Sequence, residues 1–196
     1  MREIAPRIIL ASTSPRRAEL LKHIGVEFEL ASGNVPERPH PDEAPADYIT
    51  RVARAKVMAV ARGREAGLII GADTEVVLDG QILGKPADES DAERMLNRLS
   101  GRWHAVMTGV ALVDIATKRE VADFDKTLVK FAALSKAEIE WYVKTGEPLD
   151  KAGAYGIQGF GGLFVEEIAG NYYNVVGLPL PLVYRLARRL GFSFLR

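Results

Sequence analysis

The sequence predicts an α/β fold, in which a mixed, partly antiparallel sheet carries helices on both faces. Two short apolar runs bounded by turn signals, 7–11 and 68–72, have the pattern of buried strands. Two longer segments, 104–115 and 120–134, predict a pair of antiparallel strands. Helical patterns separate these strands, and no repeat or Gly/Ser linker divides the chain, so we expect one domain spanning 1–196 with a central groove.

The first helix has clear start and stop signals directly after the strand 7–11. Ser14 is an N-cap residue and Pro15 occupies the first helical position. The helix is expected to bury an apolar face made of Leu20, Leu21 and Ile24 and to end at Gly25.

The remaining elements follow from periodicity, caps and turn residues. A half-buried strand is expected at 26–30, and Asp79-Gly80 is a hairpin turn signal between the strand segments 75–78 and 81–83. Helices are expected at about 46–65, 88–99, 135–144 with a hydroxyl cap, and 181–190, and strands at 161–168 and 172–177 around an Ala-Gly-Asn turn.

The amino-acid composition limits the classes of function that this protein can have. The chain has 196 residues, of which 47% are hydrophobic, enough for one α/β domain or two small lobes around a cleft. The 26 Lys and Arg residues balance 26 Asp and Glu residues, which argues against broad binding to a nucleic-acid backbone. No cysteine is present, which excludes disulfides, thiolate nucleophiles and cysteine-bound zinc. No apolar run is long enough for a signal peptide or a membrane span, so we expect a cytoplasmic protein without membrane or nucleic-acid partners.

A first cluster of candidate residues is the stretch "LASTSPRR" at 10–17. A helix N-terminus directly after a buried strand presents free N–H groups and the positive end of the helix dipole, which favour an anion. Ser12 and Ser14 add hydroxyl groups, and Arg16 or Arg17 adds a guanidinium. A plain capped helix with two solvated arginines explains the same residues, so both interpretations stay open from the local sequence.

A second cluster is "GADTEVVLDGQILGKP" at 71–86. Asp73 and Thr74 come immediately after the apolar run 68–72, and α/β folds bind ligands at the carboxyl ends of such strands. Asp73 is therefore a candidate metal ligand or general base, the alternative being a turn cap. Lys85 precedes a proline on a short rigid stretch and is a candidate phosphate ligand, the alternative being an ordinary exposed lysine.

Other stretches give weaker local signals. The loop "EPLDKAGAYGIQG" at 147–159 has glycines that let a ligand approach the backbone, and Gln158 is among its polar side chains; a compact surface loop is the alternative. His104, at the entrance to a strand, is expected to be structural. Glu37 in the proline-rich loop and Lys56 in the second helix are not distinguished by local pattern from a solvated carboxylate and an exposed helical charge.

Taken together, five ordered segments resemble the Maf family of nucleoside triphosphate pyrophosphatases. The segments are "LASTSPRRAELL", "GADTEVVLDGQILGKP", "SGRWHAVMTGVAL", "EPLDKAGAYGIQG" and "VVGLPL", and the resemblance runs from about 7 to 190. It implies two lobes around a nucleotide cleft, similar to inosine triphosphate pyrophosphatase folds. It also implies hydrolysis of a nucleoside triphosphate to the monophosphate and pyrophosphate with a divalent cation, Mg²⁺ first, with Mn²⁺ or Co²⁺ as alternatives.

The resemblance also implies roles for individual residues. It makes Asp73 the proton acceptor and a metal ligand, Lys56 and Lys85 the lysines that meet phosphate oxygens, and Glu37 a metal partner. The phosphate-contacting turn of the family matches Ser12, Ser14, Arg16 and Arg17.

Three positions imply a substrate. Family members that act on dTTP and UTP resemble this chain in having Arg16, Thr74 and Gln158, whereas the subtype that prefers 7-methyl-GTP replaces them. A glutamine amide can pair with a uracil-type edge, because both offer a donor and an acceptor. The resemblance therefore favours dTTP, UTP and their 5-modified forms as substrates.

Two departures from the family pattern affect the metal ligands. A proline precedes Glu37 where a further acidic residue is usual. Glu75 follows "GADT" where an apolar residue is common; an exposed strand face is expected for it rather than a metal site.

Alternative functions are a pyrophosphatase for other modified nucleotides, or a regulator of cell division (septum formation) acting through a partner, as the family name suggests. A homodimer is compatible with either.

Overall fold

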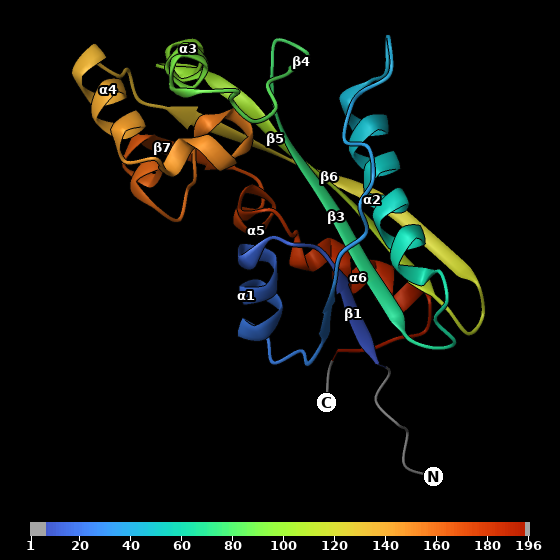
Figure 1. The fold of residues 1–196 in the computed structure, drawn as a ribbon. Helices are drawn as coiled ribbons and strands as arrows, with labels where there is room; N and C mark the ends of the chain where they lie inside the picture. The colour runs from blue at the N-terminus through green and yellow to red at the C-terminus, as the bar shows by residue number, and fades with distance from the viewer. Residues whose placement is uncertain (1–6, 195–196) are drawn as a thin grey trace. The chain divides into compact units, whose positions relative to one another are not determined.

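The computed structural model describes residues 7–194 (Figure 1). Its strands are β1 (Ile8–Ala11), β2 (Glu29–Ala31), β3 (Leu68–Leu78), β4 (Gln81–Ile82), β5 (Trp103–Asp114), β6 (Arg119–Phe131) and β7 (Val165–Ala169). Its α-helices are α1 (Pro15–His23), α2 (Pro45–Ala61), α3 (Glu89–Leu99), α4 (Lys136–Lys144), α5 (Tyr172–Val176) and α6 (Leu180–Arg189). Short 3₁₀ helices occupy Glu147–Asp150, Ala152–Ala154 and Phe160–Phe164.

The described chain forms two compact units. Unit 1 contains the described residues up to Asp73, then Thr108–Asp125 and those from Gly177 onward; unit 2 contains Thr74–Met107 and Lys126–Val176. The prediction of a single domain over 1–196 stays a prediction, and its two ends lie outside the described residues.

The strands confirm the predicted mixed sheet. Hydrogen bonding connects them in the order β2-β1-β3-β5-β6-β7, with β4 paired to β3, and β3, β5 and β6 contribute residues to both units. In unit 1, β1 pairs in parallel with both β2 and β3. In unit 2, β4 and β7 pair antiparallel with β3 and β6, respectively. The chain is therefore an α/β protein with a mixed sheet flanked by helices.

The core of unit 1 forms where α2 packs on β1 and β3. Buried Ile9, Ile69, Ala53 and Val57 share one apolar cluster. A Cβ on Gly71 of β3 would lie 2.6 Å from Val57 Cγ1 and 3.0 Å from the Ala53 carbonyl oxygen. Glycine at this position therefore lets the helix backbone approach the strand closely.

Two predictions that were made from local sequence signals concern residues of unit 2. Asp79 and Gly80 both adopt positive φ in the β3–β4 turn, as a two-residue hairpin requires. Ser135 begins α4 with a full capping box, in which its side chain accepts from the Glu138 N–H and the Glu138 carboxylate accepts from the Ser135 N–H. Both predictions are confirmed. They could be made from the sequence because each depends on residues at most four positions apart.

The predicted antiparallel pair of long strands is also confirmed. β5 and β6 are neighbours in the sheet. The Phe131 N–H donates to the Arg102 carbonyl at 3.0 Å, and the Gly101 N–H donates to the Ala132 carbonyl at 2.8 Å. Residue numbers fall along one strand as they rise along the other, which is the antiparallel pattern.

The prediction of a strand at 172–177 is wrong, because Tyr172–Val176 is the helix α5. The Asn171 side chain accepts a hydrogen bond from the Tyr173 N–H at 2.9 Å, and the Asn171 carbonyl accepts from the Asn174 N–H at 3.1 Å. Asn171 thus acts as an N-cap, which outweighs the strand preference of the tyrosines and valines that follow it.

Smaller corrections concern element ends. The second helix ends at Ala61 rather than near residue 65, and 161–164 form a 3₁₀ turn ahead of β7. Ile24 lies beyond α1 and is 42% exposed, so it is not part of the buried helix face. Within residues 7–194, no helix combines the length and apolar character needed to cross a bilayer.

Candidate functional site

Asp73 lies inside a strand rather than beyond its end. The predicted strand boundary at residue 72 is wrong, because β3 continues without interruption from Leu68 to Leu78. The pairing of β1 with β3 does end nearby, at the Ala11–Gly71 pair. The sheet edge at which we predicted a ligand therefore exists beside Asp73. It arises because β1 ends before β3 does, and not because β3 itself ends.

The alternation of side chains along β3 directs Asp73 toward α2. Ile69 and Gly71 both contact this helix, and Asp73 is the next residue of the same strand face. Val57 of α2 packs on Gly71, and Lys56 precedes it in the helix. Lys56 Nζ donates a 2.7 Å hydrogen bond to Asp73 Oδ1.

Lys56 joins the two predicted carboxylates. Its ammonium group lies 2.7 Å from Asp73 Oδ1 and 2.9 Å from Glu37 Oε1. Asp73 and Lys56 are buried, with 5% and 9% exposure, whereas the Glu37 side chain is about half exposed. Asp73 Oδ2 is buried without a hydrogen-bond partner among the described residues. A buried charged oxygen of this kind is costly unless a ligand or ion completes its hydrogen bonding.

In the turn from Ser12 to Arg17, the N-cap side chain does not cap the start of α1. Ser14 is the N-cap residue of α1, but its side chain makes no capping hydrogen bond. Its N–H instead donates to Ser12 Oγ at 3.1 Å, and Arg17 Nη1 donates to the same oxygen at 3.3 Å. Arg16 is half-buried at the second position of the helix. This strand–turn–helix arrangement presents N–H donors and positive charge where an anion would bind.

The electrostatics of Arg17 support this interpretation. Burial lowers the pKa of its guanidinium, the charge of Asp73 acts to raise it, and Arg16 lowers it further. Arg17 Nε donates a 2.7 Å hydrogen bond to the Gly177 carbonyl, which fixes the side chain. Arginine stays protonated in spite of such a shift, so the turn holds a partly desolvated cation.

The three other predicted site residues belong to unit 2. Thr74 follows Asp73 directly on β3 and is half-buried, whereas Lys85 and Gln158 are exposed. The Gly153 N–H donates to the Gly84 carbonyl at 2.8 Å, which ties the segment before Lys85 to the loop that leads to Gln158.

His104 and Gly109, both in the motif segment 100–112, have structural surroundings. His104 Nε2 lies 2.8 Å from the Tyr155 hydroxyl, and burial lowers the histidine pKa to about 4, so its ring is neutral at pH 7. A Cβ on Gly109 would lie 2.5 Å from the Ile49 carbonyl oxygen, which explains this glycine by packing. Glu75 is half-buried with Oε2 excluded from solvent, so the expectation of an exposed strand face is wrong.

Two groups of residues escaped the sequence reasoning. Arg51 makes a two-pronged ion pair with Glu43, at 2.6 and 2.7 Å, and donates to the Arg38 carbonyl, so it holds the loop that carries Glu37 against α2. Glu147 accepts hydrogen bonds from the Phe160 and Gly161 N–H groups in the loop of Gln158. These contacts of Arg51 and Glu147 with their loops span 8, 13 and 14 positions, so the local sequence gave no signal for them.

The fold and the residues gathered in unit 1 define an α/β protein in which a buried carboxylate–ammonium pair accompanies a helix-start turn that carries a buried guanidinium. The family model for Maf-like proteins matches residues 7–190, and the chain belongs to this family.

Three relatives of the chain share one functional name. The chain is 50% identical over 189 residues to a "dTTP/UTP pyrophosphatase" of Dictyoglomus thermophilum, covering 96% of this chain and 98% of that protein. Proteins of the same name from Anaeromyxobacter dehalogenans (strain 2CP-1) and Geobacter sulfurreducens are each 52% identical, covering 96% and 94% of this chain and 96% and 97% of their own. Among solved structures, the Staphylococcus aureus Ham1 protein matches with a TM-score of 0.47 and 16% identity, over 64% of this chain and 72% of that one.

Proposed function

We propose that this protein is a nucleoside triphosphate pyrophosphatase that hydrolyses dTTP and UTP, with their 5-modified forms, to the monophosphate and pyrophosphate. The observation that carries the proposal is the buried pair of Asp73 and Lys56, joined by Glu37 at 2.9 Å from the same ammonium group. The shared name of relatives about half identical over nearly the whole chain supports the choice of substrate.

The reaction needs a base for one water molecule. The water oxygen bonds to the α-phosphorus, the bond from that phosphorus to the bridging oxygen of the β-phosphate breaks, and pyrophosphate leaves. We assign the proton of the attacking water to Asp73. Its Oδ1 is held by Lys56, whereas Oδ2 is buried with no partner among residues 7–194, so this oxygen can accept the proton.

The turn at α1 is suited to hold phosphate groups. Ser12, Ser14 and Arg17 offer hydroxyl groups, helix N–H groups and a fixed guanidinium. Arg16, one position earlier in the helix, points about 100° away from Arg17 and would serve another part of the substrate. Binding of an anion would offset the desolvation that lowers the pKa of Arg17.

The residues fit a divalent cation completed by substrate. Within residues 7–194, no group of three or more Asp, Glu and His side chains could hold a metal ion by itself. Magnesium, however, is commonly held by one or two carboxylates together with water and substrate phosphates. The carboxylates of Asp73 and of the half-exposed Glu37 are of this kind, and we propose these two residues as ligands. A bound Mg²⁺, Mn²⁺ or Co²⁺ would neutralise charge on the phosphate oxygens.

Three further roles follow from the family resemblance and fall on residues of unit 2. We assign Lys85 to phosphate oxygens, Gln158 to the base, and Thr74 to substrate contact beside the proposed proton acceptor. Exposure of the Lys85 and Gln158 side chains leaves both free to meet a ligand. A cytoplasmic location and a homodimer stay predictions.

The decisive test is product analysis. Purified protein with Mg²⁺ and a panel of nucleoside triphosphates should release pyrophosphate with dTMP or UMP. Release of orthophosphate with a nucleoside diphosphate, or no turnover, would overturn the proposal. A clear preference for purine nucleotides would instead favour the alternative of a pyrophosphatase for other modified nucleotides.

Asp73→Asn tests the proposed base. We expect turnover to fall by about 10²- to 10⁴-fold, the usual contribution of a general base, with the fold retained in circular dichroism. Asp47→Asn is the matched control, because Asp47 is exposed in the first turn of α2, the helix that carries Lys56. A residual rate close to that of the control would mean that another group accepts the proton.

A further inference from the structure

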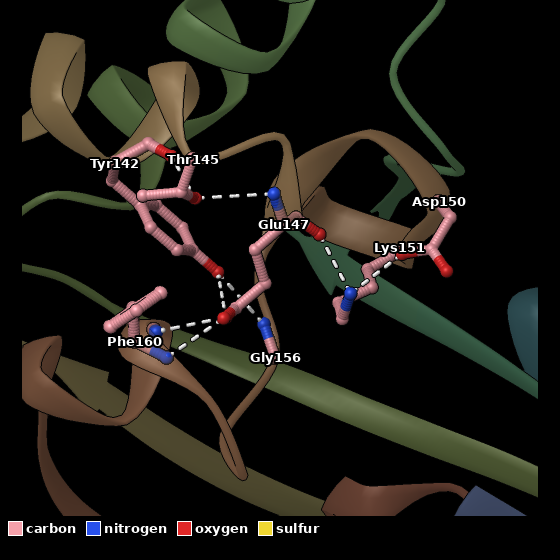
Figure 2. Close-up of polar contacts among 8 residues, drawn as sticks. Tyr142, Thr145, Glu147, Asp150, Lys151, Gly156 and Phe160 are labelled. Atoms are coloured by element: carbon pink, nitrogen blue, oxygen red, sulfur yellow. Dashed lines mark hydrogen bonds and ion pairs between the residues drawn. The ribbon is translucent and has the colours of Figure 1, made fainter. Parts of the chain in front are cut away.

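The backbone turn that carries Gln158 is held by a single carboxylate. We call residues 155–161 the Gln158 turn. Glu147 Oε1 accepts a hydrogen bond from the Gly161 N–H at 3.1 Å, and Oε2 accepts from the Phe160 N–H at 2.9 Å (Figure 2). The end of the turn is therefore fixed to one side chain that precedes it by 13 and 14 residues.

The beginning of the turn is fixed to the same carboxylate through Tyr142 of α4. The Tyr142 hydroxyl donates to Glu147 Oε1 at 2.7 Å and accepts from the Gly156 N–H at 3.1 Å (Figure 2). Tyr142 is fully buried, and burial, followed by its hydrogen bond to Glu147, raises its pKa. The hydroxyl consequently stays protonated and continues to donate. Gln158 lies between the two fixed points.

Close packing leaves the turn little freedom to move on its own. A Cβ on Gly159 would lie 2.2 Å from Glu147 Oε2, and a Cβ on Gly161 would lie 2.6 Å from the Tyr142 hydroxyl. The backbone of the turn thus lies directly against the two side chains. Any displacement of the carboxylate would displace the turn with it.

The protonation of Glu147 suits this arrangement. Burial acts to raise its pKa, but the hydrogen bonds from the Tyr142 hydroxyl and from the Gly161 and Phe160 N–H groups prevail and lower it. An ionised carboxylate only accepts hydrogen bonds, and three donors converge on this one. A glutamine at 147 would turn one NH₂ group toward one of these donors.

We propose that Glu147 is a positioning residue for substrate selection: its carboxylate, with the Tyr142 hydroxyl, fixes the turn from which Gln158 meets the pyrimidine base. This inference rests on the proposed function, since it needs Gln158 to contact the base. The Gln158 side chain is exposed, so the position of its backbone decides what its amide can reach. Glu147 acts through that backbone and touches no substrate.

The test separates the base end of the substrate from the phosphate end. We expect Glu147→Gln to raise the KM for dTTP about tenfold, as for the loss of one well-formed hydrogen bond, while kcat changes less. The inhibition constant of inorganic triphosphate, which has no base, should stay within twofold of wild type. Tyr142→Phe keeps the ring and removes the hydroxyl, and should act in the same direction.

A double variant distinguishes positioning from general stability. In a Gln158→Ala background, Glu147→Gln should have no further effect on the KM for dTTP, because the side chain that it positions is absent. Glu140→Gln is the matched control: it removes a partly exposed carboxylate of α4 that pairs with Lys136. It should change neither constant.

Three outcomes would overturn the inference: equal weakening of dTTP and inorganic triphosphate, full additivity with Gln158→Ala, or an unchanged KM in both Glu147→Gln and Tyr142→Phe. If Glu147→Gln does not fold, the same criteria apply to Tyr142→Phe. Wild-type protein without dTTP or UTP turnover would refute the proposed function instead, so the two failures are distinguishable.

Discussion

Thr127→Val should destabilise the protein strongly, although it preserves the size and shape of the side chain. Thr127 on β6 is fully buried. Its hydroxyl donates to the Asn171 carbonyl at 3.1 Å and accepts from the Asn171 N–H at 3.0 Å and from Asn174 Nδ2 at 3.0 Å. One oxygen therefore fixes the start of α5 against the sheet.

The magnitude follows from these three hydrogen bonds. Each contributes about 1 kcal/mol to the free energy of unfolding, and a buried partner left unpaired adds to the loss, so Val at Thr127 should cost about 3 kcal/mol. Thr127→Ser keeps the oxygen and loses one buried methyl group, which should cost only about 1 kcal/mol. The larger effect belongs to the variant that better preserves volume.

Urea unfolding followed by tryptophan fluorescence measures both variants. The chain has two tryptophans, Trp103 and Trp141, and both lie in unit 2 together with Thr127. If Thr127→Val proves as stable as Thr127→Ser, the hydroxyl does not hold α5 and the reasoning fails.

Two further predictions concern acid stability and specificity. Hydrogen bonds from Arg51 lower the pKa of Glu43 from 4.5 to about 2, so the stabilisation by this pair is complete above pH 4.5 and is lost as the pH falls toward 2. The difference in urea midpoint between wild type and Glu43→Gln should accordingly shrink from pH 6 to pH 3; a constant difference would contradict it. Gln158→Glu should change the order of preferred nucleotides while the thermal midpoint stays within about 2 °C; an unchanged substrate profile would count against contact of Gln158 with the base.

Residues that act on near neighbours were predictable from the sequence. The capping box of Ser135 and Glu138 involves positions three apart, and the hairpin at Asp79-Gly80 needs only residues that tolerate positive φ. The same local chemistry operates at Asn171, where the N-cap hydrogen bond outweighs the strand preference of the residues that follow.

The geometry of the candidate site could not be read from the sequence. The family resemblance implied roles for Asp73, Lys56 and Glu37, which stay predictions, and the structure brings both carboxylates to the Lys56 ammonium group. Local pattern alone did not distinguish Lys56 from an exposed helical charge. The close packing of α2 on Gly71 brings Lys56 to Asp73, which is 17 residues away in the sequence. Only the tertiary structure shows this contact.

The sequence by itself determined the fold class, the hydroxyl cap of α4, the β3–β4 turn and the family, because these depend on periodicity, local hydrogen bonds and ordered motifs. Tertiary structure alone decided that β3 runs through Asp73, that Arg51 holds the loop of Glu37, and that Glu147 holds the turn of Gln158. The contacts of Arg51 and Glu147 with these loops join residues eight or more positions apart, and the sheet edge at Asp73 depends on where the neighbouring strand β1 ends. Such contacts follow from how helices and strands pack, and no spacing in the sequence encodes them.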